Sequence, residues 1–381
     1  MGWQHRRKQE TSVEDYYQLD VLVPGPVPVS PEVLAAIGRP VPVHYGPTFV
    51  PFYKGLVERL KQIFGTSSPV FPMGGSGTAG VEAALSTLLG VEKHAAVVVN
   101  GSFGERLLAI ARAYDPEALS IEFEWGKAAD PAEVGKFLDA HRVDVLAVVQ
   151  SETSTGVLNP IRELADVAHQ RDVAIMVDGV GSVGGAPLCL DGWGIAAAAT
   201  ASQKCLEAPP GLGIAALSEV GWKLADSLKR PTPGFYLNLR TWRKSAEDSP
   251  DHHPYPVTVA TNNLMALDQA VQRVLAEGLE ARYERHRRVA TYLRAALRAL
   301  DFRLLADDDA ASPTVTVATP PEGIDPAQLM MTLRQEYGMV IGGGLGKLGG
   351  KVVRIGHLGS SAQEVMMNRV IAAIDVALRS A

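Results

Sequence analysis

The sequence predicts an α/β protein with two parts: a large doubly wound domain on a mostly parallel sheet, and a smaller α+β domain at the C-terminal end. Short runs rich in Val, Ile and Ala alternate with helical stretches between about residues 80 and 218. These runs are apolar at consecutive positions, as is typical of strands covered by helices on both faces. After about Pro256 a long helical stretch and a few further strands replace this alternation.

The predicted strands of the large domain share this continuous apolar character; they are residues 95–100, 119–124, 144–150, 173–178, 196–202 and 213–218. Helical patterns lie among them, at residues 80–89, 105–113, 131–141 and 160–170. Strands that alternate with helices predict a sheet layered between helices.

The C-terminal part has its own predicted elements. Strands are expected at 303–305, 314–318 and 351–358, helices at 262–300, 326–337 and 361–378, and a glycine-rich turn at 342–344. We place the domain boundary inside the long helix near Gly278, so that this helix bridges the two lobes. The predicted division is an N-terminal extension (1–21), a large domain (22–277) and a small domain (278–381).

Composition limits the classes of function. The 381-residue chain carries a formal net charge of −6, which argues against binding to nucleic acid or to an anionic membrane surface. Its two cysteines, Cys189 and Cys205, cannot form a disulfide framework and favour a reducing compartment. No apolar run reaches the ~18–20 residues that span a bilayer, and the polar N-terminus lacks a signal-peptide core. We therefore expect a cytoplasmic protein.

Candidate ligand-binding residues follow the predicted strands, because ligands of open α/β sheets bind at the carboxyl ends of the strands. The first candidate is the loop 74–80, GGSGTAG, which precedes a helix. Its glycines permit close backbone approach, and the helix N-terminus attracts phosphate. Ser76 and Thr78 add hydroxyl donors. No Gly-Lys-Ser/Thr follows and no clear strand precedes the loop, so a helix-capping turn explains it about equally well.

The second candidate is Phe103, which follows a predicted strand. An aromatic side chain there can stack on a flat cofactor ring, a contact that contributes on the order of 1 kcal/mol beyond burial. Taken alone, a core phenylalanine is the simpler interpretation.

The third candidate is Asp178, which ends the apolar run VAIMVD. A carboxylate there is costly to bury without a partner, and a protonated pyridine nitrogen would be a suitable one. A helix cap or a metal ligand are the alternatives. We predict no metal site, because no cluster of histidines with ligand spacing accompanies Asp178.

The fourth candidate is Lys204, in Ser202-Gln203-Lys204 after the apolar run AAAATA. Desolvation lowers the pKa of an amine and suits it to a Schiff base, although an isolated lysine in a turn is usually a surface residue. Lys204 comes about 26 residues after Asp178, one βαβ step along the chain. Together, the four candidates indicate a pyridoxal 5'-phosphate enzyme with its cofactor on Lys204.

Several motifs resemble those of the class V pyridoxal-phosphate aminotransferases, in particular the alanine–glyoxylate and serine–glyoxylate group. They are VPGP at 23–26, GSGT at 75–78 with VEAAL at 81–85, ETSTGVL at 152–158, VDGV at 177–180, SQKCLEAPPG at 202–211 and KVVRIGHLG at 351–359. The resemblance covers nearly the whole chain after about residue 20. It implies fold type I with a seven-stranded, mostly parallel sheet, and a homodimer.

The resemblance also assigns residue roles. Lys204 matches the Schiff-base lysine and proton shuttle, and Asp178 the partner of the ring nitrogen. The other cofactor-binding positions are Ser76, Gly77, Thr78, Phe103, Thr153, Val180 and Gln203. Arg354 matches the arginine that binds the substrate carboxylate, and Gly25 belongs to the loop over the substrate.

Two stretches depart from the family pattern. Asp251 and Pro254 stand where relatives carry a Tyr and a Thr that reach the cofactor phosphate of the second subunit. Tyr255 or His253 would be the substitutes. The stretch VHYGP at 43–47 matches no particular substrate, and its His44 and Tyr45 fit the pocket or the surface equally well.

The leading hypothesis is transamination from a small amino acid such as alanine or serine to a 2-oxo acid such as glyoxylate or pyruvate. An alternative is a β-eliminating or decarboxylating lyase that acts on cysteine or a cysteine S-conjugate. A non-catalytic binding protein is disfavoured by intact Lys204, Asp178 and Arg354. A nicotinamide dehydrogenase is disfavoured because no glycine fingerprint is followed by an acidic residue ~20 positions on.

Overall fold

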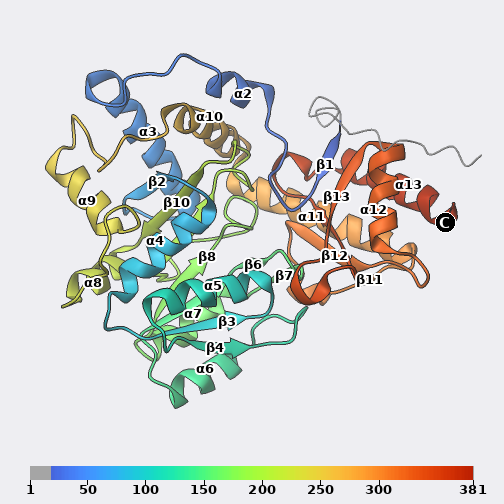
Figure 1. Cartoon of the computed structure of the whole chain (residues 1–381), viewed down its shortest axis with the longest axis horizontal. Coiled ribbons are helices and arrows are strands. Elements are labelled where there is room, and N and C mark those ends of the chain that lie inside the picture. Colours follow the sequence, from blue (N-terminus) through green and yellow to red (C-terminus); the bar gives the residue numbers. More distant parts are fainter. Residues whose placement is uncertain (1–18, 381) are drawn as a thin grey trace, which may run out of the picture.

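A computed structural model describes residues 19–380 and contains a large and a small sheet, each with its own helices (Figure 1). The predicted N-terminal extension, 1–21, lies almost wholly outside the described residues. No helix within 19–380 is both long and apolar enough to cross a bilayer.

The large sheet has seven strands in the order β2-β10-β9-β8-β5-β3-β4, and confirms the predicted fold type I architecture. Its strands are β2 (Val70–Gly74), β3 (Ala95–Val99), β4 (Leu119–Glu122), β5 (Val145–Val149), β8 (Ala174–Asp178), β9 (Ala197–Ala201) and β10 (Leu212–Leu217). Every residue of β3, β5, β9 and β10 is buried, so both faces of the sheet are covered. Strand β10 runs antiparallel to both of its neighbours, and the other pairs are parallel, so the sheet is mostly parallel as predicted.

Strand β2 corrects the expectation that no strand precedes the loop 74–80. Among residues 19–380 it pairs only with β10, at the edge of the sheet. Its Pro72 argues against a central strand but is tolerated at an edge, where one side of the backbone needs no partner. The glycine loop therefore does connect a strand to a helix.

Helices cover the large sheet and form one hydrophobic core with it. They are α2 (Pro31–Ile37), α3 (Gly46–Phe64), α4 (Gly77–Leu89), α5 (Ser102–Tyr114), α6 (Pro131–Ala140), α7 (Ile161–His169), α8 (Glu219–Ser227), α9 (Leu239–Asp248) and α10 (Thr261–Glu277). A short hairpin of β6 (Ser151–Glu152) and β7 (Val157–Leu158) follows β5. Turns rather than a helix connect β8 to β9, so the expected βαβ step between Asp178 and Lys204 was wrong.

The small sheet has the order β1-β13-β14-β12-β11. Its elements are β1 (Asp20–Leu22), α11 (Leu279–Ala299), β11 (Arg303–Leu304), β12 (Val315–Thr319), α12 (Pro326–Tyr337), β13 (Met339–Gly343), β14 (Val353–Gly356) and α13 (Glu364–Arg379). Its helices and strands share a second hydrophobic cluster. Gly342 and Gly343 belong to β13, so the turn expected at 342–344 begins later than predicted.

Gly278 divides the long predicted helix into α10 and α11. Its φ of +83° is outside the helical region, so the helix stops there and a second one begins. The expectation of one continuous helix was therefore wrong. The division into domains at residue 278 stays a prediction, and strand β1 belongs to the small sheet although it lies at the other end of the sequence.

Candidate active site

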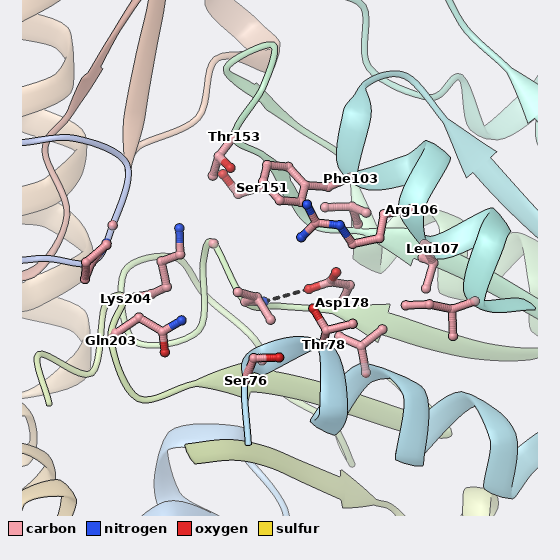
Figure 2. Close-up of a pocket in the computed structure, with 18 residues that line it drawn as sticks. Ser76, Thr78, Phe103, Arg106, Leu107, Ser151, Thr153, Asp178, Gln203 and Lys204 are labelled. Atoms are coloured by element: carbon pink, nitrogen blue, oxygen red, sulfur yellow. Dashed lines mark hydrogen bonds between the residues drawn. The ribbon is translucent and has the colours of Figure 1, made fainter. Parts of the chain in front are cut away.

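A cavity of about 220 Å³ lies at the carboxyl ends of strands β5, β8 and β9 (Figure 2). Ten of the eleven predicted site residues line it: Gly25, Ser76, Gly77, Thr78, Phe103, Thr153, Asp178, Val180, Gln203 and Lys204. Arg354 is the exception. Residues from segments that are far apart in the sequence therefore meet at one point.

Asp178 is the last residue of β8 and is buried. Its Oδ1 accepts a hydrogen bond of 2.9 Å from the backbone N–H of Val180. Burial raises the pKa of Asp178 to about 6, against the lowering effects of that hydrogen bond and of nearby Arg106 and Lys204. At neutral pH the carboxylate is therefore ionised but poorly solvated, and a cation would be a favourable partner.

Lys204 comes just after β9, and its Nζ donates a hydrogen bond to the carbonyl oxygen of Pro24. Burial lowers the pKa of Lys204 to about 8, so a sizeable fraction of the amine is neutral near pH 8. Gly25 has φ +96°, and a Cβ there would lie 2.8 Å from the Nζ. Only glycine lets the N-terminal loop pass this close over the lysine.

The N-terminus of α5 is held by the buried carboxylate of Glu152. Its Oε2 accepts hydrogen bonds from the backbone N–H groups of Phe103 (3.0 Å) and Gly104 (2.9 Å). Its Oε1 accepts from the backbone N–H and hydroxyl of Ser154. Two of the free N–H groups of α5 are thus satisfied inside the protein, and the ring of Phe103 is fixed at the cavity wall.

The N-terminus of α4 is arranged differently. Ser76 is its N-cap residue, but its side chain makes no capping hydrogen bond. A Cβ on Gly77 would lie 2.8 Å from the Cβ of Ala201, so the helix approaches β9 closely. The buried Oε1 of Gln203, also at the cavity, has no hydrogen-bond partner among residues 19–380. This end of the cavity therefore offers free backbone N–H groups, two hydroxyls and the Nε2 of Gln203 to an anion such as a phosphate, whereas the Oε1 of Gln203 is an acceptor and suits a donor.

Arg354, on β14, lies behind Thr153 rather than at the cavity wall. Its Nε donates to the carbonyl of Gly343 (2.6 Å), and its Nη1 donates to the carbonyl of Thr153 (3.2 Å). Burial lowers its pKa, while Glu152 opposes that effect. Thr153 thus connects this arginine of the small sheet to the cavity.

Sequence reasoning missed three of the residues at the site. Arg106 lines the cavity, 4.8 Å from the centre of the Phe103 ring, and Figure 2 shows it between Phe103 and Asp178. Arg106 follows Phe103 by three residues on a helix, and this spacing predicts that both side chains lie on the same face. Ser151 also lines the cavity, and Glu152 was noted only as part of a motif.

The two stretches that depart from the family pattern lie away from this cavity. Tyr255 is 1% exposed, and its hydroxyl donates to the carbonyl of His44 within the same chain. Asp251 forms an exposed ion pair with Lys54 at 2.7 Å. Tyr45 lines a separate apolar hollow of about 680 Å³.

The set of groups fits pyridoxal phosphate: an anion site at α4, an aromatic wall, a buried carboxylate and a desolvated lysine. On the doubly wound sheet, these features define the class of pyridoxal-phosphate enzymes of fold type I.

Comparison with known proteins narrows the class. The family profile "Aminotransferase class-V" matches residues 70–352, and the chain belongs to this family of pyridoxal-phosphate-dependent aminotransferases. An uncharacterized aminotransferase of Methanocaldococcus jannaschii is 37% identical over 94% of this chain and 92% of its own length. The (S)-ureidoglycine–glyoxylate transaminase of Bacillus subtilis is 32% identical over 94% of this chain and 90% of its own length. The crystal structure of an alanine–glyoxylate aminotransferase from Nostoc sp. matches with a TM-score of 0.89 at 29% identity, over 95% of both chains. The enzyme therefore transfers an amino group to a 2-oxo acid.

Proposed function

We propose that this aminotransferase moves the amino group of a small amino acid, such as alanine or serine, to glyoxylate or pyruvate. The observation that carries the proposal is the convergence of Lys204, Asp178 and the uncapped α4 on one cavity. Two of the similar proteins carry glyoxylate in their names, which supports this acceptor.

The proposed roles follow from the geometry. Ser76, Thr78 and the first N–H groups of α4 hold the phosphate, and Phe103 stacks on the ring. Asp178 keeps the ring nitrogen protonated. The cofactor, when bound, supplies a ring that withdraws electrons from the donor α-carbon.

Lys204 and Arg354 act on the substrate. The Nζ of Lys204 would hold the cofactor and, as a free amine, would take the donor's α-proton, for which its pKa of about 8 suits it. Arg354 binds the donor carboxylate with its planar guanidinium. Gly25 lets the N-terminal loop pass closely over this region.

We also propose a cytoplasmic homodimer. The apolar hollow beside α3 has the exposed side chains of Val43 (62%) and Tyr45 (47%) at its wall, which suits burial against a second copy. His252 lines the same hollow, and with His253 it is the candidate for a contact with the second subunit. The thiols of Cys189 and Cys205 are both free, which fits a reducing compartment.

An absorbance titration of the loaded enzyme with amines, in the absence of acceptor, tests the function. The panel holds alanine, serine, 2-aminoethylphosphonate, pyridoxamine and a cysteine S-conjugate. Formation of the pyridoxamine form with one equivalent of 2-oxo product identifies the donor. Continued product release without acceptor contradicts the proposal and identifies a lyase.

A further inference from the structure

Arg282, near the start of α11, contacts two loops of the large domain. It is 3% exposed. Its Nε donates to the carbonyl of Gly184 and one Nη donates to the carbonyl of Cys205, both at 2.7 Å. Gly184 lies in the loop that follows Asp178, and Cys205 directly follows Lys204. The guanidinium of Arg282 thus joins the loop that follows Asp178 to the turn that carries Lys204.

The turn that carries Lys204 has a second tie to the same arginine. Glu207, which has φ +58°, donates its backbone N–H to the carbonyl of Lys204 at 3.0 Å and closes the turn. Its carboxylate pairs with Arg282. Arg282 therefore contacts this turn through both a carbonyl and a carboxylate.

On its other side, Arg282 is connected to Arg285 through Glu277, the last residue of α10. Its Nη1 donates to Glu277 (2.7 Å), which also accepts from Arg285 (2.6 and 3.0 Å). Burial raises the pKa of Glu277, but the hydrogen bonds from Arg285 and Arg282 outweigh it and hold the pKa at about 2. The carboxylate is therefore charged near neutral pH, where it pairs with both arginines.

Arg285 reaches the segment that follows the Arg354 strand. Its Nη1 donates to the carbonyls of Gly359 (3.0 Å) and Ala362 (2.7 Å). His286 reinforces this contact, because its Nδ1 donates to the Arg282 carbonyl and its Nε2 accepts from the Gly359 N–H. Burial lowers the pKa of His286 to about 3, so the ring is neutral and can donate from Nδ1 while it accepts at Nε2.

We propose that Arg282 is a positioning residue, which sets the Lys204 turn relative to Arg354 through the chain Arg282–Glu277–Arg285. A buried ion pair is weak evidence for stability by itself, since desolvation offsets the attraction. These ions instead bond to main-chain atoms next to the two residues that must act on one substrate. The inference rests on the proposed roles of Lys204 and Arg354.

The test compares Arg282→Lys with Arg288→Lys in the full-length, cofactor-loaded enzyme. Arg288 lies on the same helix and makes an exposed pair with Glu364, so it is the matched control. Lysine keeps the charge of Arg282 but cannot reach both carbonyls. We expect Arg282→Lys to lower kcat about 10- to 100-fold, as a small misplacement of a reacting group does. The pH midpoint of cofactor absorbance should move by ~0.5 or more. Arg288→Lys should change neither.

Wild-type kcat and absorbance midpoint in a folded Arg282→Lys protein would overturn the proposal and leave a structural role only. If that variant does not fold, Glu277→Ala is decisive, because it leaves the carbonyl contacts of Arg282 but removes the acceptor that links Arg282 to Arg285. It should raise the KM of the donor with an unchanged absorbance midpoint; a wild-type KM refutes the coupling. Borohydride reduction and peptide mapping of the wild type identify the cofactor-bearing lysine separately. Label on another lysine refutes the proposed function, whatever the Arg282 variants do.

Discussion

The carboxylate of Glu152 accepts a hydrogen bond of 3.0 Å from the backbone N–H of Phe103, the aromatic residue at the cavity wall. Four donors converge on this fully buried side chain. It is therefore the group that fixes where α5 begins.

Replacing Glu152 with Gln should destabilise the protein by about 2 kcal/mol. The amide NH₂ of Gln replaces one of the two accepting oxygens, so the buried donors on that side lose their acceptor. Urea unfolding of the cofactor-free protein measures this. Glu105→Gln, an exposed change on the same helix, should have almost no effect. Equal stability of the two variants contradicts the assigned role.

The amine of Lys204 should react with a small acylating reagent with a midpoint near pH 8 in the cofactor-free protein, rather than near the ordinary 10.5. Burial favours the neutral amine, so reactivity is gained earlier as pH rises. Mass spectrometry after short exposures measures the rate at each pH. Lys223, which is 73% exposed, is the internal reference. Parallel pH profiles of the two lysines would refute the lowered pKa.

Asp178→Asn should stabilise the cofactor-free protein by about 3 kcal/mol at pH 8, the equivalent of a pKa raised from 3.8 to about 6. The folded state binds the Asp178 proton more tightly than the unfolded state, so its contribution to stability is lost as pH rises from about 4 through 6. Asn can still accept from the Val180 N–H and removes the buried charge.

Thermal unfolding of wild type and Asp178→Asn across pH 4–8 checks this. The two curves should converge near pH 4. A variant that is less stable than the wild type at pH 8 contradicts the expected desolvation of Asp178. Addition of pyridoxal phosphate should reverse the order, since only the wild type offers a carboxylate to the ring nitrogen.

Ser76→Ala and Thr78→Val should each weaken pyridoxal phosphate binding about 10- to 100-fold, the loss of one hydrogen bond to a charged group. Pyridoxal, which lacks the phosphate, is the matched control ligand. Fluorescence titration with both ligands gives the ratio of dissociation constants. If both affinities fall alike, the hydroxyls do not contact the phosphate.

Gly25→Ala should remove most activity, because its Cβ would collide with the Lys204 side chain. Gly323→Ala is the control: its φ of +85° is similar to the +96° of Gly25, but a Cβ there meets nothing within 4 Å. Both variants carry a comparable backbone strain. Steady-state kinetics with equal losses in the two variants would show that strain alone acts at Gly25.

Much of the site could be predicted from the sequence, because the end of a buried strand is visible as a polar residue directly after an apolar run. Asp178 and Lys204 each follow an apolar run, and parallel strands bring such residues to one edge of the sheet. Strand β2 was not predicted, because proline is unfavourable inside a strand. Pro72 is tolerated there because β2 lies at the edge of the sheet. The partners of Glu152 and Arg282 could not be predicted, because Phe103 and Glu207 lie 49 and 75 residues away.

Strand β1 pairs with β13, so Asp20 lies beside Met339, more than 300 residues further along the chain. During synthesis, β1 emerges early but has no partner in its sheet until β13 has been made. The loop that passes over Lys204 begins at the end of β1, and that anchor therefore forms late. The large sheet and the anion site at α4 can assemble first. The loop over Lys204 takes up its final position only when β13 has folded and paired with β1.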